Sequence, residues 1–289
     1  MRRPVLCFIL SILCVGCART AGSTGALLLV DDAGDTVRLA RPALRVASLI
    51  PATTELLFAI GAGATVVGRT SWCDWPPAAA AVANLGDGIA PNVEAVVGVR
   101  PDLVLLYPSA RNALAVEQLR RFGIATLQLR TDTFDDLARH ATLLGRATGR
   151  EREAERLMAR TDSALRAHDR TGTGGPRVLI LAWDQPPMTI GRGSFLHQVV
   201  TMAGGENVFA DLTTPDAPVS LEAIVERQPD VILTTSATPG FARRPEWQVI
   251  PAVRLRRFVT LSGSEYSRPS PRAPEAIRRL AAAFDSLGR

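Results

Sequence analysis

Short apolar runs alternate along the chain with segments in which apolar residues recur at a helical spacing. The runs are rich in Val, Leu and Ile and occupy residues 45–50, 66–67, 103–106, 126–129, 178–182, 231–234 and 258–261. Because strands separated by helices usually pair in parallel, this alternation predicts an α/β fold with central, mainly parallel sheets. Before these runs, residues 27–30 and 36–39 flank an Asp- and Gly-rich turn and are predicted to form a β-hairpin.

One helix-and-strand unit occurs twice, at a separation of 128 positions. Residues 92–105 and 220–233 align without a gap and share a Glu, an Ala, a Pro and an Asp at equivalent positions. Each copy starts with a capping Asn or Ser, carries an acid in the first helical turn (Glu94 or Glu222) and ends in a Pro-Asp turn and a buried strand. The repeat therefore predicts two Rossmann-like lobes of the same architecture.

A long amphipathic segment separates the two copies. Its apolar face is formed by Ala154, Leu157, Met158, Thr161, Ala164 and Leu165. We expect one helix over 146–170 to bridge an N-terminal lobe, 18–145, which includes a tether and the hairpin, and a C-terminal lobe, 176–289. Such a helix would restrict hinge motion more than flexible connecting strands could.

Residues 1–17 have the pattern of a signal peptide. Arg2 and Arg3 precede an apolar run over 5–15, which is too short to span a bilayer, and Gly16-Cys17 follows. This ending resembles the site at which bacterial lipoproteins are acylated, although Cys14 stands where Leu is usual. We therefore expect a protein exported to the periplasm or cell envelope and anchored to the membrane by lipid on Cys17. Secretion without lipid and retention inside the cell are the alternatives.

The composition of the 289 residues narrows the chemistry. All 33 basic residues are arginine, which excludes mechanisms that need a lysine, and their scattered positions give no support for nucleic-acid binding. The three histidines, His140, His168 and His197, match no zinc motif, and no Ser-His or dinucleotide-binding arrangement has the required context. The sequence thus predicts neither an enzyme nor a resident metal or cofactor.

Removal of the signal peptide would take away Cys7 and Cys14, and lipid would block Cys17. Cys73 would then be the one free thiol. A single thiol cannot form an internal disulfide, so two interpretations remain open. Cys73 is either a small buried side chain or a thiol that faces a ligand.

An ordered set of motifs resembles a known family. These are Val-Ala-Ser-Leu-Ile-Pro-Ala-Thr-Thr-Glu (46–55), Trp-Cys-Asp-Trp-Pro-Pro (72–77), the two repeat units, the long helix, Ala-Gly-Gly-Glu-Asn-Val-Phe (203–209) and Arg-Pro-Ser-Pro-Arg (268–272). Together they resemble the helical-backbone substrate-binding proteins of ABC importers, and in particular the cobalamin-binding component. The resemblance implies two lobes with a ligand cleft between them. It also implies that Glu94 and Glu222 meet arginines on the two permease subunits, whereas the simpler interpretation is that both acids only stabilise helix ends.

Loop aromatics are the expected ligand contacts. Trp72 and Trp75 flank Cys73, and Trp183 follows a strand at the end where ligands bind in parallel sheets. Indole faces suit a flat macrocycle such as cobalamin. The full set of expected ligand-binding residues is Pro51, Trp72, Cys73, Trp75, Tyr107, Trp183 and Arg268. Trp247 lies in a helix-start context and is predicted to be structural.

The sequence departs from the cobalamin binder in two places. Residues 86–88 and 215–218 lack tryptophans that the cobalamin-binding component carries there. A ferric siderophore or haem is therefore an alternative ligand, with Arg268 and Arg272 as partners for its acidic groups. The alternative outside transport is a ligand sensor that works without a permease.

Overall fold

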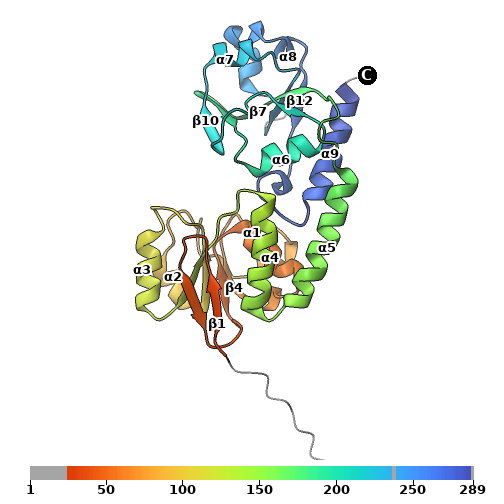
Figure 1. The fold of residues 1–289 in the computed structure, drawn as a ribbon. Coiled ribbons are helices and arrows are strands. Elements are labelled where there is room, and N and C mark those ends of the chain that lie inside the picture. Colours follow the sequence, from red (N-terminus) through yellow and green to blue (C-terminus); the bar gives the residue numbers. More distant parts are fainter. Residues whose placement is uncertain (1–24, 236–238, 288–289) are drawn as a thin grey trace, which may run out of the picture.

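A parallel four-stranded sheet forms the centre of the N-terminal lobe in the computed structural model, which describes residues 25–235 and 239–287 (Figure 1). The expected signal peptide and Cys17 lie outside these described residues. The strand order is β4 (Val66–Arg69), β3 (Val46–Ser48), β5 (Leu103–Leu106) and β6 (Ala125–Gln128). The helices of this lobe are α1 (Pro51–Ala59), α2 (Val93–Gly98), α3 (Ala113–Arg121) and α4 (Phe134–Thr148).

Helices pack on both faces of this sheet, and the side chains of β5 show how. Leu103 and Leu105 belong to a core cluster with residues of α1 and α4, whereas Val104 and Leu106 pack with residues of α2 and α3. A strand that is covered on both faces has no polar side, which is why this run is apolar throughout. The predicted hairpin is present as β1 (Leu27–Val30) and β2 (Thr36–Leu39).

The C-terminal lobe is built on a mixed sheet. The strands β7 (Arg177–Asp184), β9 (Glu206–Asn207), β11 (Val231–Thr234) and β12 (Phe258–Thr260) are parallel, and β8 (Pro187–Ile190) and β10 (Asp216–Pro218) are antiparallel additions. The sequence analysis missed β8 and β10, because neither has the apolar run of a strand buried on both faces. The helices are α6 (Phe195–Met202), α7 (Leu221–Glu226), α8 (Pro251–Arg254) and α9 (Ala273–Leu287).

The two repeat units make the same contacts just before the first residues of their strands. The backbone N–H of Asp102 donates to the carbonyl of Arg45 at 2.9 Å, and that of Asp230 donates to the carbonyl of Arg177 at 2.8 Å. In return, each aspartate carboxylate accepts the backbone N–H of its arginine. Each arginine also donates Nη2, at 2.7 Å, to the carbonyl of the residue that follows the short helix of the repeat. That residue is Val99 after α2 and Arg227 after α7. The similarity of the two lobes therefore extends to an arginine at the start of an inner strand of each sheet, just before β3 in one lobe and as the first residue of β7 in the other.

The bridging helix, α5 (Glu151–His168), begins later than predicted. Residues 146–148 belong to α4 instead, because Gly149 takes a left-handed conformation at φ 67° and ends that helix. The 18 residues of α5 span about 27 Å at 1.5 Å per residue. Of the predicted face, Ala154, Leu157 and Thr161 are buried.

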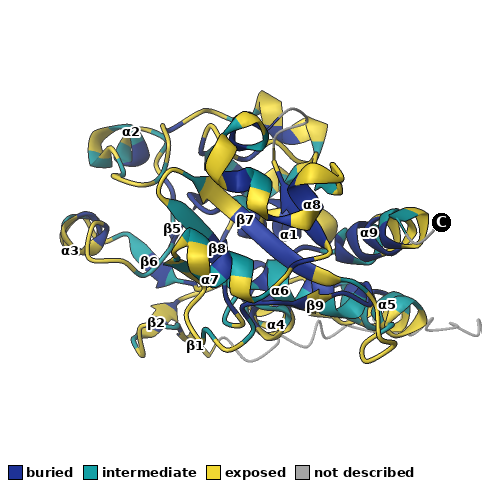
Figure 2. Cartoon of the chain, turned by 90° about the horizontal axis from the view of Figure 1, so that it is seen from above, coloured by how far each residue is buried: buried dark blue, intermediate teal, exposed yellow. Residues whose placement is uncertain are grey.

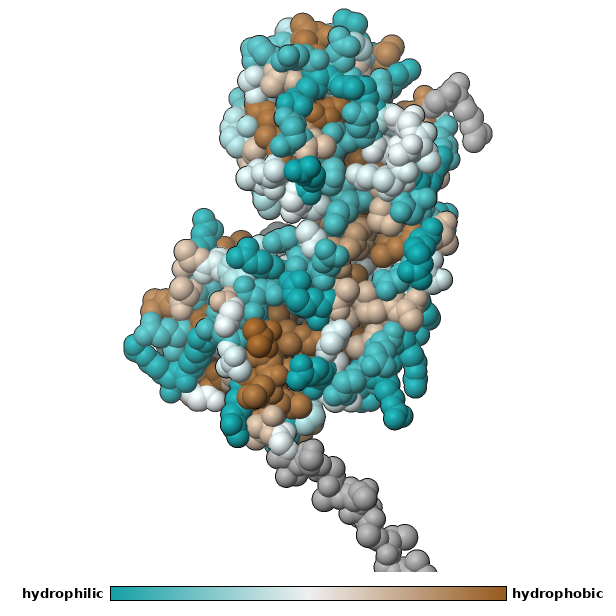
Figure 3. All heavy atoms as spheres, viewed as in Figure 1, coloured by the Kyte–Doolittle hydropathy of each residue, from teal (hydrophilic) through white to brown (hydrophobic). Residues whose placement is uncertain are grey.

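The last helix, α9, returns beside α5, as both Figure 1 and the view from above in Figure 2 show. Two helices thus run along the same side of the molecule. On the opposite side, a notch separates the two lobes (Figure 3). None of the helices within 25–235 and 239–287 is both long and apolar enough to span a membrane.

Candidate functional site

A cavity of about 290 Å³ lies between the lobes, at the carboxyl ends of the N-terminal strands. It is lined by Ile50, Pro51 and Ala52 at the start of α1, by Trp72 and Asp74 after β4, by Thr131 after β6, and by Ser264, Ser267 and Arg268 between β12 and α9. We call this the interlobe cavity. Its position agrees with the general placement of ligands at the carboxyl ends of parallel strands.

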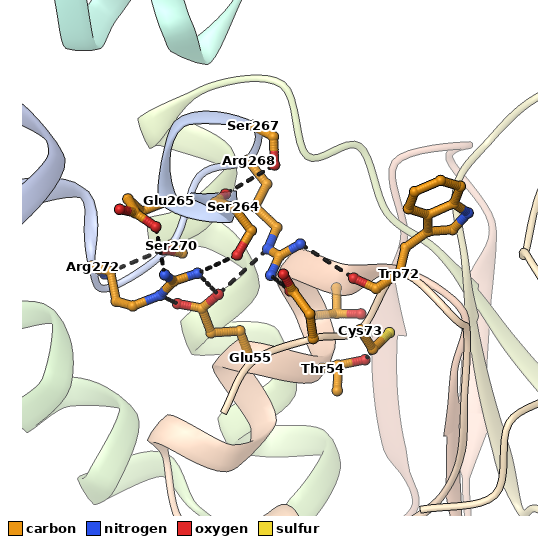
Figure 4. A network of polar contacts seen from close by, with 12 residues as sticks. Thr54, Glu55, Trp72, Cys73, Ser264, Glu265, Ser267, Arg268, Ser270 and Arg272 are labelled. Carbon is orange, nitrogen blue, oxygen red and sulfur yellow. Dashed lines mark hydrogen bonds and ion pairs between the residues drawn. The ribbon is translucent and has the colours of Figure 1, made fainter. Parts of the chain in front are cut away.

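Trp72 is the aromatic side chain of this cavity. It is 61% exposed, and Figure 4 shows its indole extending away from the neighbouring arginines. Pro51, the first residue of α1, lines the same cavity. An exposed indole contributes little to the stability of its own lobe, so its large apolar face is available to a ligand.

Cys73 does not face the cavity. Its side chain is 1% exposed, and its Sγ lies 3.1 Å from the Thr54 hydroxyl and 3.2 Å from the Thr70 hydroxyl. The expectation of a ligand-facing thiol is therefore corrected: Cys73 is the buried residue of a loop in which Trp72, Asp74 and Trp75 are exposed.

Trp75 contacts the other lobe. The guanidinium carbon of Arg272 lies 4.6 Å from the centre of the Trp75 ring, within the range of a cation–π interaction. One face of this indole is thus occupied by the protein itself. Trp75 is absent from the lining of the interlobe cavity and differs in this respect from Trp72.

Arg268 lines the cavity, but its guanidinium is already bound. It is 8% exposed, is paired with the carboxylates of Glu55 and Asp74, and has Nη1 3.4 Å from the carbonyl of Trp72. Burial alone would raise the pKa of Asp74, but the hydrogen bond and positive charge of Arg268 outweigh it and lower that pKa. Arg272, expected to bind an acidic ligand, is likewise paired with Glu55 and Glu265.

Tyr107 follows β5 and does not line the interlobe cavity. Its hydroxyl donates to the Asp132 carboxylate, with both oxygens at 3.0 Å. Burial, and then the negative charge of Asp132, raises the pKa of Tyr107 to about 12. The phenol therefore keeps its proton to a higher pH than an ordinary tyrosine does.

Trp183 belongs to a separate hollow of about 180 Å³ in the C-terminal lobe. It is 61% exposed, and its indole N–H donates to the carbonyl of Gln185 at 2.8 Å. The structure therefore places Trp72 and Trp183 in different lobes and does not bring them into one cavity. Trp247 is buried against Phe241, with ring centres 4.5 Å apart, which confirms the structural role predicted for it.

Glu94 and Glu222 lie away from both hollows, in the first turns of α2 and α7. Both are exposed, and the preceding Asn92 and Ser220 cap the two helices in the same way. Hydrogen bonds from its own backbone and from Ser220 lower the pKa of Glu222.

The sequence analysis missed the acidic partners in this region, namely Glu55, Asp74 and Glu265. Glu55 follows two threonines in α1 and stands directly before Leu56, Leu57 and Phe58, and this acid next to an apolar run was the available signal. Within the described residues, no cluster of three or more His, Cys, Asp or Glu side chains could hold a metal ion.

Comparisons with known proteins agree with this architecture. Residues 46–264 match the periplasmic binding protein family. The vitamin B12-binding protein of Salmonella typhimurium is 30% identical, over 84% of this chain and 91% of its own. The ABC transporter substrate-binding lipoprotein YvrC of Bacillus subtilis is 30% identical, over 87% of this chain and 83% of its own.

Solved structures agree as well. The periplasmic heme-binding protein RhuT of Roseiflexus is 26% identical, with a TM-score of 0.75 over 85% of this chain and 99% of its own. The vitamin B12-binding protein BtuF of Vibrio cholerae shares the fold, with a TM-score of 0.68 at 23% identity over 86% of this chain and 99% of its own. The chain therefore belongs to the periplasmic binding protein family of ABC transport systems and resembles its vitamin B12-binding members.

Proposed function

We propose that this protein is the substrate-binding component of an ABC importer and that it captures a corrinoid between its lobes. The observation that carries the proposal is Trp72, an indole 61% exposed at the mouth of the interlobe cavity, in a chain whose relatives include vitamin B12-binding proteins. Pro51 adds a second rigid apolar surface to the same cavity.

The proposal has a physical basis in the area that an indole can cover. Covering ~100 Å² of apolar ligand with one indole face contributes roughly 2–3 kcal/mol. Pockets for drug-sized ligands measure about 300–1,000 Å³, so a corrinoid, which is larger, must extend beyond a cavity of about 290 Å³. The hollow beside Trp183 in the facing lobe is the proposed second contact surface.

Haem and ferric siderophores remain the second candidate class, because one of the similar solved structures is a heme-binding protein. Haem iron is held by His, Cys, Met or Tyr side chains. Tyr107 is poorly suited, since its hydroxyl is committed to Asp132 and its pKa is raised to about 12. Cys73 is buried and hydrogen-bonded. Neither of these two expected contact residues is therefore suited to hold a haem iron.

Delivery to a permease is proposed to use Glu94 and Glu222. Each is an exposed first-turn acid on a helix of the same length and capping, one in each lobe. Two matched acids can engage the arginines of a symmetric permease dimer and fix the orientation of the binding protein on it. The alternative without a permease is a ligand sensor, for which these acids would have no partner.

The protein is proposed to act outside the cytoplasmic membrane, held there by lipid on Cys17. The N-terminal pattern and the similarity to a substrate-binding lipoprotein support this location. Replacing Cys17 with Ser should release the protein from membranes in a fractionation experiment. Continued attachment of C17S would show that the anchor is not on this residue.

Direct titration tests the ligand. Cyanocobalamin added to the purified protein should quench tryptophan fluorescence with micromolar or tighter affinity, which corresponds to about −8 kcal/mol. Haemin and a ferric hydroxamate, titrated in parallel, should bind more weakly. Mass spectrometry of ligand that co-purifies from the native source provides the independent measurement. If cyanocobalamin left the tryptophan emission unchanged and haemin quenched it to saturation, the corrinoid proposal would be wrong and haem would be the ligand.

A further inference from the structure

The lobes are joined by buried polar contacts as well as by α5. Glu55, on α1 of the N-terminal lobe, is 2% exposed and accepts Arg272 Nε at 2.7 Å and Arg272 Nη2 at 2.9 Å. Arg268 Nε lies 3.4 Å from the same carboxylate. Figure 4 shows both arginines reaching Glu55 from the segment between β12 and α9. We call Glu55, Arg268 and Arg272 the interlobe clamp.

Glu265 fastens the clamp to the C-terminal helix. Its carboxylate accepts Arg272 Nη1 at 2.9 Å and, from α9, Arg279 Nη1 at 3.0 Å. Gly263 makes this turn possible: it has φ 122°, and a Cβ there would lie 2.4 Å from Glu265 Oε2. Because α9 packs beside α5, the clamp is linked through α9 to the helix that connects the lobes.

The clamp also holds the loop that carries Trp72. Arg268 pairs with Asp74 and has Nη1 3.4 Å from the carbonyl of Trp72, and Arg272 stacks 4.6 Å from the ring centre of Trp75. The two arginines thus contact three of the four residues in 72–75, which we call the Trp loop. Every one of these contacts crosses from the β12–α9 segment to the N-terminal lobe.

We propose that Arg272 and Glu55 are positioning residues for the ligand site. Anchored on Glu55, Arg272 holds the Trp loop so that the Trp72 indole projects into the cleft. Because the holding groups come from the far side of the cleft, any separation of the lobes withdraws them and releases the loop. The orientation of the ligand-binding indole is thereby coupled to the separation of the lobes, and the part of this inference that concerns ligand affinity rests on the proposed function.

Neither Arg272 nor Glu55 lines the interlobe cavity, so their effect on a ligand must pass through the loop. The test uses protein labelled with 5-fluorotryptophan and ¹⁹F NMR without ligand, with signals assigned by single Trp→Phe variants. Arg272→Lys keeps a cation beside Glu55 but loses the bidentate contact and the stacking. Glu55→Gln is the second variant. We expect the Trp72 and Trp75 signals to shift and broaden in both variants, and those of Trp183 and Trp247 to stay in place.

Arg227→Lys is the matched control. Arg227 also combines an ion pair, with Asp211 at 2.8 Å, and a cation–π contact, 4.4 Å from the Phe209 ring centre, but it lies away from the Trp loop. It should leave the Trp72 and Trp75 signals unchanged. In Arg272→Lys, cyanocobalamin affinity should fall by about tenfold through lost preorganisation.

Two results would overturn the inference. In one, the Trp72 and Trp75 signals are unchanged in both clamp variants. In the other, all four signals shift together, which would give the clamp a role in folding only. Failure of cyanocobalamin to bind the unmodified protein would count against the corrinoid proposal instead, because the ¹⁹F measurement needs no ligand.

Discussion

The two lobes are alike where the repeat unit lies and different where the cleft lies. In α2 and α7, the cap, the exposed glutamate and the pattern of buried and exposed residues coincide. Even the residues after the helices, Arg100 and Gln228, share a left-handed backbone with φ 47° and 43°. At the expected ligand contacts, by contrast, the N-terminal lobe presents the Trp loop after β4, which pairs in parallel with β3, whereas Trp183 lies on β7 where it pairs with antiparallel β8.

This difference matches the symmetry of the proposed partners. A permease made of two equivalent subunits presents the same surface twice, so matched acids on the two lobes complement it. A ligand such as a corrinoid has no such symmetry, and the two walls of its cleft need different groups. The lobes are thus expected to have kept the shared unit for docking and to have diverged at the cleft.

The largest effect is expected when the charges of the two matched acids, Glu94 and Glu222, are reversed. Because like charges brought together at an interface cost several kcal/mol, reversing both acids (Glu94→Arg with Glu222→Arg) should reduce uptake by more than about 100-fold. Ligand affinity should stay unchanged, and each single reversal should give an intermediate loss. Uptake assays in cells and fluorescence titration of the purified variants measure the two quantities.

The control for this prediction reverses one exposed acid in each lobe elsewhere, with Glu117→Arg and Glu246→Arg. These reversals change the net charge equally and should leave uptake nearly intact. Lost ligand affinity in the Glu94 and Glu222 variant would place these acids at the ligand instead of at the permease.

A smaller effect is expected at the two proposed walls of the ligand cleft. Trp72→Ala and Trp183→Ala should each weaken cyanocobalamin binding by about 2–3 kcal/mol, roughly 30- to 150-fold. Trp75→Ala should weaken cyanocobalamin binding less through lost contact, since one face of its ring is already covered by Arg272. Isothermal titration calorimetry measures all three, with Trp247→Phe as the buried control. A loss confined to one wall would mean that a single lobe binds the ligand.

The smallest effect tests whether the shared strand-end contacts are equally strong. Asp102 accepts two backbone N–H groups, from Leu44 at 2.9 Å and Arg45 at 3.0 Å, whereas Asp230 accepts that of Arg177 at 2.8 Å. Asp102→Ala should therefore lower the free energy of unfolding by about 1–2 kcal/mol, and Asp230→Ala by about 1 kcal/mol. Urea denaturation at constant m-value measures both. An equal loss in the two variants would mean that the second N–H contributes nothing.

Much of the fold could be predicted from local signals. Strands such as β5 and β11 have apolar runs because helices cover both of their faces, and the repeat was visible because α2 and α7 keep the same caps. The break between α4 and α5 was missed, although Gly149 in an amphipathic pattern is a typical helix end. The antiparallel β8 and β10 lacked such a signal.

The site was less predictable, because its geometry depends on distant residues. Trp72 was predicted as a loop aromatic, and it lines the interlobe cavity together with Pro51, which was also among the expected residues. The buried Cys73 thiol contacts not only nearby Thr70 but also Thr54, 19 positions earlier, and no local spacing reveals the second contact. The pairing of Glu55 with Arg272 joins residues 217 positions apart, and nothing in either neighbourhood identifies the other.

That separation has a consequence for how the molecule is made. A chain emerging from the ribosome presents Glu55 long before Arg268 and Arg272 exist, and domains that are made first generally fold first. The N-terminal lobe must therefore form with this carboxylate still hydrated, and the carboxylate loses its water only when the last segment arrives. Burial of Glu55 is thus a late event in folding, and any chain shortened before residue 268 would leave the acid permanently in contact with solvent.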